Sequence, residues 1–324
     1  MKTIGIFPAS GGLGTSTYQH LLKLVPDDKL VLISRHPDKV AEKYVQAGVQ
    51  TRQASYETDP SDLERAFSGV DVLFLISYPS HVKDYRIKVQ LPAVDAARRA
   101  GVQHIFYSSL AFAGPRESTS SLAEVMQAHL ATESYLKSLA EASASKKFTY
   151  TSIREGIYSE STPIYTSFFD VQNPDSSTNS TNEILIPHDG KGAGVAWVKR
   201  DELGEASAKL IAEYASGPEE GFKHTNKVVL LTGNKEWTLE DSVKLLGEVS
   251  GKKDLKIRQI SVDEWVQLPQ IKKYFPNETD ARTWSTAWEA IRQGATAPVT
   301  KDLEEILGRK PEEFDVTLKS SVAS

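Results

Sequence analysis

A glycine-rich turn near the amino terminus constrains the fold of this chain more than any other segment. The apolar run 3–7 (TIGIF) is typical of a short strand, and the segment 8–14 (PASGGLG) follows it directly. A helical pattern then covers 15–24, and a second apolar run lies at 30–33. A strand, a glycine turn and a helix in this order surround a pyrophosphate with backbone N–H groups at the helix start. The segment therefore predicts a dinucleotide-binding unit.

The residues after the second apolar run predict which dinucleotide is bound. A carboxylate there would bind the ribose 2′-hydroxyl of NAD, whereas a cation suits the 2′-phosphate of NADP. The chain has Ser34 and Arg35 at this point, and Lys39 lies about one turn further on. The alternative is a pair of solvated charges at a helix start, where cations are mildly unfavourable against the dipole. We therefore expect NADP(H) as the cofactor. The residues expected to hold its pyrophosphate are Gly11, Gly12, Leu13 and Gly14.

Pro8 departs from the usual glycine pattern. A Gly-x-x-Gly-x-x-Gly arrangement would place glycines at positions 8, 11 and 14, but position 8 is proline. Proline has a fixed negative φ and does not adopt the positive φ that glycine allows. We expect the turn to begin differently while its three glycines still allow close backbone approach.

Strand and helix patterns alternate through the first half of the chain. Further strands are predicted at 49–54, 70–77, 103–108 and 147–153, and helices at 37–47, 63–67, 85–100 and 122–142. Six strands separated by helices predict an α/β fold, a doubly wound parallel (Rossmann) sheet over residues 1–155.

The alternation ends beyond residue 155. A polar segment at 170–182 predicts an exposed loop, and helical patterns lie at 201–215, from 238 onward, and at 262–267, 280–292 and 301–307. Strands near 195–198 and 228–231 are expected to complete the sheet. Residues 156–324 are therefore expected to form a smaller, mostly helical part, interleaved with the sheet, that binds a substrate or a partner.

Composition narrows the classes of function. The net charge of −5 and the absence of a basic run give no reason to expect nucleic acid. The chain has no cysteine, and its seven histidines have no metal-ligand spacing, so no metal site is expected. No apolar stretch is long enough to span a membrane, and the first strand begins almost at Met1, so we expect a cytoplasmic protein.

Five segments together resemble the NmrA-like family, a group of atypical short-chain dehydrogenase/reductase folds common in fungi. They are PASGGLGTSTYQHLL, SRHPDK, VDVLFLIS, IREGIYSES and GRKPEEF. The resemblance extends over nearly the whole chain and implies an NADP-binding Rossmann domain with a smaller substrate-binding part. Members of the family are NADPH-dependent reductases of quinones, azo dyes or isoflavones, or non-enzymatic NADP sensors that bind regulatory proteins. Some fungal members belong to secondary metabolism.

The resemblance also implies particular cofactor contacts. Besides the glycine turn, they are Arg35, Lys39, Tyr56, Glu57, Ser77, Tyr78, His129, Tyr158, Ser159 and Glu160.

The usual catalytic pair of short-chain reductases is absent. These enzymes place Tyr-x-x-x-Lys on one helix face, where the ammonium lowers the pKa of the phenol. None of the twelve tyrosines has a lysine four residues later, and His129 stands where the family usually has that lysine. His129 could bind a ribose hydroxyl or, when protonated, donate a proton. The alternative is a polar residue that faces solvent.

Two other residues are candidate catalytic groups. Ser108 ends the fifth predicted strand, where ligands bind in such sheets, and Tyr158 follows the sixth. The alternatives are a serine bonded to backbone and an aromatic ring packed under the carboxyl-terminal part.

The missing tyrosine acid favours acceptors whose reduced form is weakly basic, such as quinones, because an isolated ketone would give a strongly basic alkoxide. The leading hypothesis is therefore an NADPH-dependent reductase of a conjugated small molecule. The alternative is a non-catalytic NADP(H) sensor that binds a protein partner.

Overall fold

A seven-stranded parallel sheet forms the centre of the protein in the computed structural model, which describes residues 1–143, 148–176, 181–217 and 221–323. The strands are β1 (Ile4–Phe7), β2 (Leu30–Ser34), β3 (Gln50–Gln53), β4 (Val72–Ile76), β5 (His104–Leu110), β6 (Thr149–Glu155) and β8 (Lys227–Leu231). Their order is β3–β2–β1–β4–β5–β6–β8, which confirms the predicted doubly wound sheet. The direction of winding reverses between β1 and β4, and ligands bind at the carboxyl ends of strands around such a reversal.

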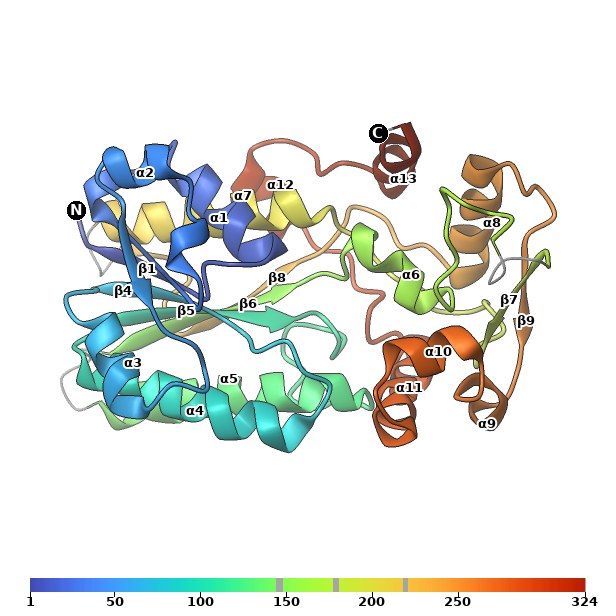
Figure 1. The fold of residues 1–324 in the computed structure, drawn as a ribbon, viewed down its shortest axis with the longest axis horizontal. Coiled ribbons are helices and arrows are strands. Elements are labelled where there is room, and N and C mark those ends of the chain that lie inside the picture. Colours follow the sequence, from blue (N-terminus) through green and yellow to red (C-terminus); the bar gives the residue numbers. More distant parts are fainter. Residues whose placement is uncertain (144–147, 177–180, 218–220, 324) are drawn as a thin grey trace.

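Helices cover both faces of the sheet (Figure 1). One layer contains α1 (Gly12–Leu21), α2 (Glu42–Gln46), α7 (Arg200–Ser216) and α12 (Asp302–Leu307). The other contains α3 (Pro60–Phe67), α4 (Lys83–Arg99) and α5 (Glu124–Ala142). Because the central strands are buried on both faces, β2 (LVLIS) and β4 (VLFLI) are almost continuously apolar.

The carboxyl-terminal part lies beyond one end of the sheet (Figure 1). Its elements are α6 (Thr162–Tyr165), β7 (Glu183–Ile186), α8 (Leu239–Ser250), β9 (Lys256–Gln259), α9 (Val262–Trp265), α10 (Pro269–Tyr274), α11 (Glu278–Arg292) and α13 (Phe314–Ala323). It has its own hydrophobic core, in which Trp197, Trp265, Trp284 and Trp288 pack together. Helix α11 contacts α5, so this core joins the sheet domain at the carboxyl ends of the strands.

Several predicted elements differ from the structure. Segment 195–198 is not a strand, because Val195 pairs with Trp237 and Val198 with Tyr158 in isolated bridges. The predicted helix 37–47 is interrupted: a 3-10 turn, η2 (Pro37–Lys39), precedes the short α2. Strands β7 and β9 form a separate two-stranded sheet that the sequence did not predict. The first residue of the predicted strand 147–153 lies outside the described residues, and so does part of the polar segment, 177–180.

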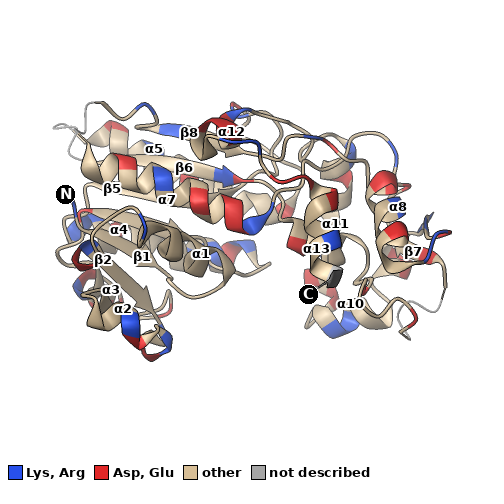
Figure 2. Cartoon of the chain, turned by 90° about the horizontal axis from the view of Figure 1, so that it is seen from above, with Lys and Arg blue, Asp and Glu red and all other residues tan. Residues whose placement is uncertain are grey.

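The described residues contain no helix that is long and apolar enough to span a membrane, and no cluster of acidic, histidine or cysteine side chains suited to a metal. Acidic and basic residues are interspersed along outer helices such as α7 (Figure 2).

Candidate functional site

The glycine turn forms an open anion site at the start of α1. Gly11 caps the helix with φ of 90°, a conformation that favours glycine, and none of the described side chains caps its first N–H groups. A Cβ on Gly14 would lie 2.7 Å from the carbonyl oxygen of Pro8, so strand and helix approach too closely for a larger residue. Pro8 follows a cis peptide bond. The turn therefore presents backbone donors that suit a pyrophosphate.

Arg200 adds a positive charge to this turn. A Cβ on Gly12 would lie 2.6 Å from Arg200 Cζ, so the guanidinium lies directly against the glycine backbone. Helix α7 is anchored there, because the Ser16 hydroxyl donates to the Asp201 carboxylate over 2.6 Å. The backbone N–H of Arg200 donates to Glu160, 3.1 Å from Oε2. The sequence analysis missed Arg200, which belongs to no recognisable motif and is far from the turn in the chain.

A second basic region lies at the ends of β2 and β3. Arg35 lines an open depression of about 750 Å³ together with His36, Arg52 and Arg65. Arg52 is fixed there by Nη1, which donates to the carbonyl oxygen of Ala66 over 2.8 Å. Lys39 lies in η2 and does not line this depression. The geometry therefore assigns Arg35 more directly than Lys39 to a 2′-phosphate.

Two adjoining cavities follow the carboxyl ends of the strands. The first, of about 440 Å³, extends from the glycine turn past Ser77 and Tyr78. The second, of about 430 Å³, lies toward the carboxyl-terminal part. The residues that line both are Ser77, Ser108, His129, Tyr158 and Tyr274. A dinucleotide groove therefore continues into a separate compartment.

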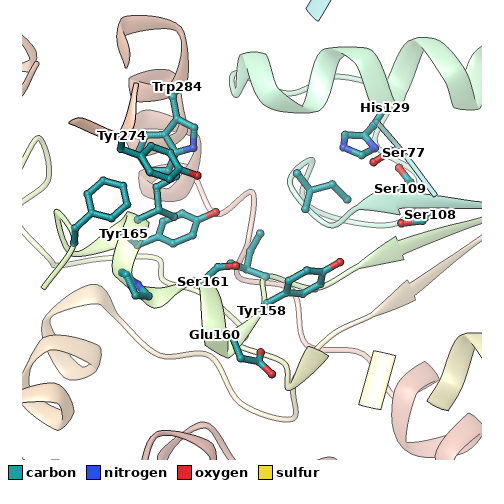
Figure 3. A pocket seen from close by; sticks show the side chains of 16 residues that line it. Ser77, Ser108, Ser109, His129, Tyr158, Glu160, Ser161, Tyr165, Tyr274 and Trp284 are labelled. Carbon is teal, nitrogen blue, oxygen red and sulfur yellow. The ribbon is translucent and has the colours of Figure 1, made fainter. Parts of the chain in front are cut away.

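Aromatic side chains form the far wall of the second cavity. Figure 3 shows Tyr165, Tyr274 and Trp284 opposite His129, with Tyr158 between the two groups. These rings come from α6, α10 and α11, so the carboxyl-terminal part supplies this wall. A compartment lined by aromatic rings favours a conjugated ligand that can pack against them.

Besides Arg35 and Lys39, three predicted contact residues lie outside both cavities. Tyr56 is buried, and its hydroxyl donates to the carbonyl oxygen of Ile76 over 2.6 Å. Glu57 accepts a hydrogen bond of 2.5 Å from the Tyr78 hydroxyl, and this bond is the largest cause that raises the pKa of Tyr78 to about 12. Ser159 is buried beside the second cavity, whereas Glu160 lines it. Tyr56, Glu57 and Ser159 are thus placed to support the groove rather than to line it.

His129 is buried, so the interpretation that it faces solvent is wrong. Its Nε2 lies 2.7 Å from Arg86 Nη2, and its Nδ1 lies 3.2 Å from the Tyr107 hydroxyl. Burial, and then the positive charges of Arg86 and Arg154, hold the pKa of His129 well below its ordinary value. The imidazole is therefore neutral, which argues against its use as a cationic proton donor.

A buried carboxyl group lies behind Tyr158. Glu155 is 1% exposed, and its Oε2 lies 2.8 Å from the Tyr158 hydroxyl. Burial raises the pKa of Glu155 to about 8, although hydrogen bonds from Tyr158 and Ser108 oppose the rise. The residue was not predicted from the sequence, where its only signal is an acidic residue just beyond the sixth predicted strand.

The fold and the site together define a Rossmann-type dinucleotide-binding protein. The site fits a dinucleotide with a 2′-phosphate, because the glycine turn offers backbone N–H donors and Arg35 offers a cation. Strand β2 ends at Ser34 and not at a carboxylate. The NmrA-like family model matches residues 1–283, and the chain belongs to this family.

Two relatives of this chain have the word oxidoreductase in their names. The chain is 31% identical to the NmrA-like family domain-containing oxidoreductase flvB of Aspergillus flavus over 306 residues, 94% of this chain and 89% of the relative. It is 32% identical to quinone oxidoreductase 2 of Escherichia coli over 251 residues, 77% of this chain and 75% of the relative. These names agree with an NADP-dependent oxidoreductase.

Solved structures with bound cofactor have the same fold. Triphenylmethane reductase of Citrobacter sp., complexed with NADP(H), has a TM-score of 0.74 and 29% identity over 98% of this chain and 99% of its own. The E. coli quinone oxidoreductase complexed with NADPH has a TM-score of 0.77 and 26% identity over 99% and 100%. Both cofactors agree with the NADP(H) predicted from the end of β2.

Proposed function

We propose that this protein is an NADPH-dependent reductase of a planar, conjugated small molecule, either quinone-like or an intermediate of secondary metabolism. The observation that carries the proposal is the aromatic cavity, which adjoins the dinucleotide groove and shares five lining residues with it. When bound, the cofactor supplies a hydride from its nicotinamide ring.

The side chains divide into three roles. The glycine turn and Arg200 bind the pyrophosphate, and Arg35 binds the 2′-phosphate. His129, held by Arg86, orients the part of the cofactor that reaches the junction of the two cavities. The aromatic wall stacks on the acceptor and excludes water from it. Ser108 and Tyr158 offer hydroxyl donors to the acceptor at the same junction.

The chemistry of these donors favours a conjugated acceptor. A hydride added to a quinone leaves a delocalised, weakly basic anion, which a weak proton donor such as a phenol can protonate. Neutral His129 replaces the usual lysine, so the site lacks an ammonium group to lower the pKa of a catalytic phenol. Reduction of an isolated ketone would therefore be slow.

The test is NADPH oxidation in the presence of quinones, triphenylmethane dyes or saturated ketones. The reaction is measured as the loss of NADPH absorbance. We expect turnover of conjugated acceptors and little reaction with the ketones. Trp284→Ala should raise KM for a bulky quinone while the rise in melting temperature caused by NADPH stays unchanged, because Trp284 lines only the second cavity. Equal turnover of ketones and quinones would contradict the assigned acceptor class.

A regulatory role is the second candidate, and the neutral His129 is the observation that favours it. In that case NADPH would raise the melting temperature, no acceptor would be reduced, and NADP⁺ and NADPH would differ in their effect on a protein partner.

A further inference from the structure

We propose that Glu155 is a buried proton donor that reloads Tyr158, and that Tyr158 in turn protonates the reduced acceptor. The assignment rests on the proposed reductase function and identifies the residues of its proton-transfer step. It also supplies an acid in a chain that lacks the Tyr-x-x-x-Lys pair.

The geometry places the two groups in series. Tyr158 lines both the dinucleotide groove and the aromatic cavity, whereas Glu155 lines neither. The hydroxyl oxygen of Tyr158 lies 2.8 Å from Glu155 Oε2, within reach of direct proton transfer. The phenol therefore stands between the buried carboxyl group and the space where an acceptor would bind.

The surroundings of Glu155 keep a proton on it. Its partners across the sheet are Leu110 in β5 and Leu231 in β8, and no described cation forms an ion pair with it. The polar groups that face it are the hydroxyls of Tyr158 and Ser108. Burial raises the pKa of Glu155 to about 8, so the carboxyl group is mostly protonated at neutral pH. The Tyr158 hydroxyl donates to Glu155 Oε2 in the structure. When Glu155 carries a proton, this bond can reverse, so that the carboxyl group donates to the phenol oxygen and the phenol O–H is free to turn to the cavity.

The phenol alone would be a poor acid. Burial and the neighbouring Glu155 raise the pKa of Tyr158 well above its ordinary value, and the opposing charges of Arg200 and Glu160 are smaller influences. Loss of its proton would leave a buried tyrosinate, unless a second proton arrives at the same time. Glu155 can supply that second proton, which is why the two residues work as a pair.

Protons move from Glu155 to Tyr158 and from Tyr158 to the reduced acceptor. Bound NADPH would supply two electrons and one hydrogen as hydride, and the acceptor would then lack one proton. The O–H bond of Tyr158 breaks as the new bond to the acceptor forms, and the O–H bond of Glu155 breaks as that of Tyr158 forms again. When the product leaves, water that enters the cavity returns a proton to Glu155 through the Tyr158 hydroxyl. Each turnover therefore consumes one proton from solvent.

Glu155→Gln tests the relay, because the amide keeps the size and the hydrogen bond but has no proton to transfer. We expect the kcat of the wild type to fall as the pH rises through about 8. In Glu155→Gln, kcat at neutral pH should be at least about 10-fold lower and that pH dependence should be lost. Glu141→Gln, on the exposed end of α5, is the matched control and should keep the wild-type profile.

A second measurement does not depend on activity. Infrared difference titration of the cofactor-free protein should show a protonated carboxyl band that disappears at about pH 8 and is missing in Glu155→Gln. The rise in melting temperature on adding NADPH should be equal in both proteins. If Glu155→Gln is unstable, Glu155→Asp replaces it, with a lower kcat but a retained pH dependence.

A failure of the proton relay can be distinguished from a failure of the proposed reductase function. An active wild type together with an equally active Glu155→Gln, or a carboxyl group that titrates at its ordinary pKa, would overturn the relay alone. A wild type that binds NADPH but reduces no acceptor would overturn the proposed function and the relay with it.

Discussion

Arg86 Nη2 and His129 Nε2 lie 2.7 Å apart and connect α4 to α5 beneath the dinucleotide groove. A guanidinium can only donate, so Nε2 is the unprotonated nitrogen and Nδ1–H is directed to the Tyr107 hydroxyl. Arg86 is itself buried and also donates to the carbonyl oxygen of Val125. A buried cation therefore holds the imidazole neutral in one tautomer.

Removal of this cation should raise the pKa of His129. In Arg86→Met, burial and the charge of Arg154 still lower the pKa, but the larger of the two positive charges that oppose protonation is gone. NMR of the imidazole, assigned with His129→Gln, should show no titration of the wild type between about pH 5 and 8. The variant should titrate at a higher pH than the wild type. An ordinary titration in the wild type would contradict the neutral assignment.

The buried ion pair between Arg154 and Glu133 should be essential for stability. Arg154 Nη2 lies 2.7 Å from Glu133 Oε2, and both side chains are buried. Glu133 lies one helical turn after His129 on α5. Glu133→Ala leaves an unpaired buried cation, so we expect a loss of about 3–5 kcal/mol in urea unfolding. Glu133→Leu combined with Arg154→Met should regain much of this loss.

The control for this prediction lies on the same helix. Lys137 and Glu141 form an exposed pair at 3.9 Å, and Lys137→Ala should cost less than about 1 kcal/mol. Equal losses for the buried and exposed variants would contradict the argument from burial.

Two glycine substitutions should separate strain from steric clash in the turn. At Gly11 a Cβ meets nothing within 4 Å, so Gly11→Ala is penalised only by its backbone conformation, with φ of 90° and ψ of 171°, which costs about 1–3 kcal/mol. Gly14→Ala forces a Cβ against the Pro8 carbonyl oxygen and should cost about 1–3 kcal/mol. Because strand and helix must move apart, Gly14→Ala should also weaken stabilisation by NADPH in a thermal melt. A Gly14→Ala variant that NADPH stabilises as much as the wild type would contradict the close packing of strand and helix in the turn.

The sheet and the turn could be predicted because their signals are local. Strands β2 and β4 are continuous apolar runs, and the glycine turn lies between a strand and a helix that are both adjacent in the chain. The wrongly predicted strand at 195–198 is also apolar and buried, but its backbone bonds go to Ile157, Trp237 and Thr296. Apolar periodicity reports burial, and it does not identify the hydrogen-bond partner.

The parts of the site that were missed depend on contacts across long stretches of chain. Arg200 reaches Gly12 only because α7 packs beside α1, and Arg86 meets His129 only because α4 packs beside α5. Glu155 could be recognised as a buried acid only after the strands on both sides of it were known. Such residues have no motif in the sequence, because tertiary packing alone brings them together.

Cofactor selectivity should depend more on Arg35 than on Lys39. Arg35 lines the basic depression at the end of β2, and Lys39 does not. NADPH should raise the melting temperature of the wild type more than NADH does, and Arg35→Ala should remove most of that difference. Lys39→Ala should retain it. Equal stabilisation of the wild type by both cofactors would contradict recognition of the 2′-phosphate.

Acid should destabilise the protein through His104. This histidine is fully buried in β5, where its ring nitrogens bond to Thr149 and Thr151, and burial lowers its pKa to about 3. Below about pH 6.5 the unfolded chain binds a proton at this position, whereas the folded chain does not until about pH 3. The free energy of unfolding therefore decreases as the pH is lowered through this window. At pH 5 it is about 2 kcal/mol smaller than at neutral pH. In urea unfolding at several pH values, His104→Gln should flatten this dependence, while His36→Gln, at an exposed position, should leave it unchanged.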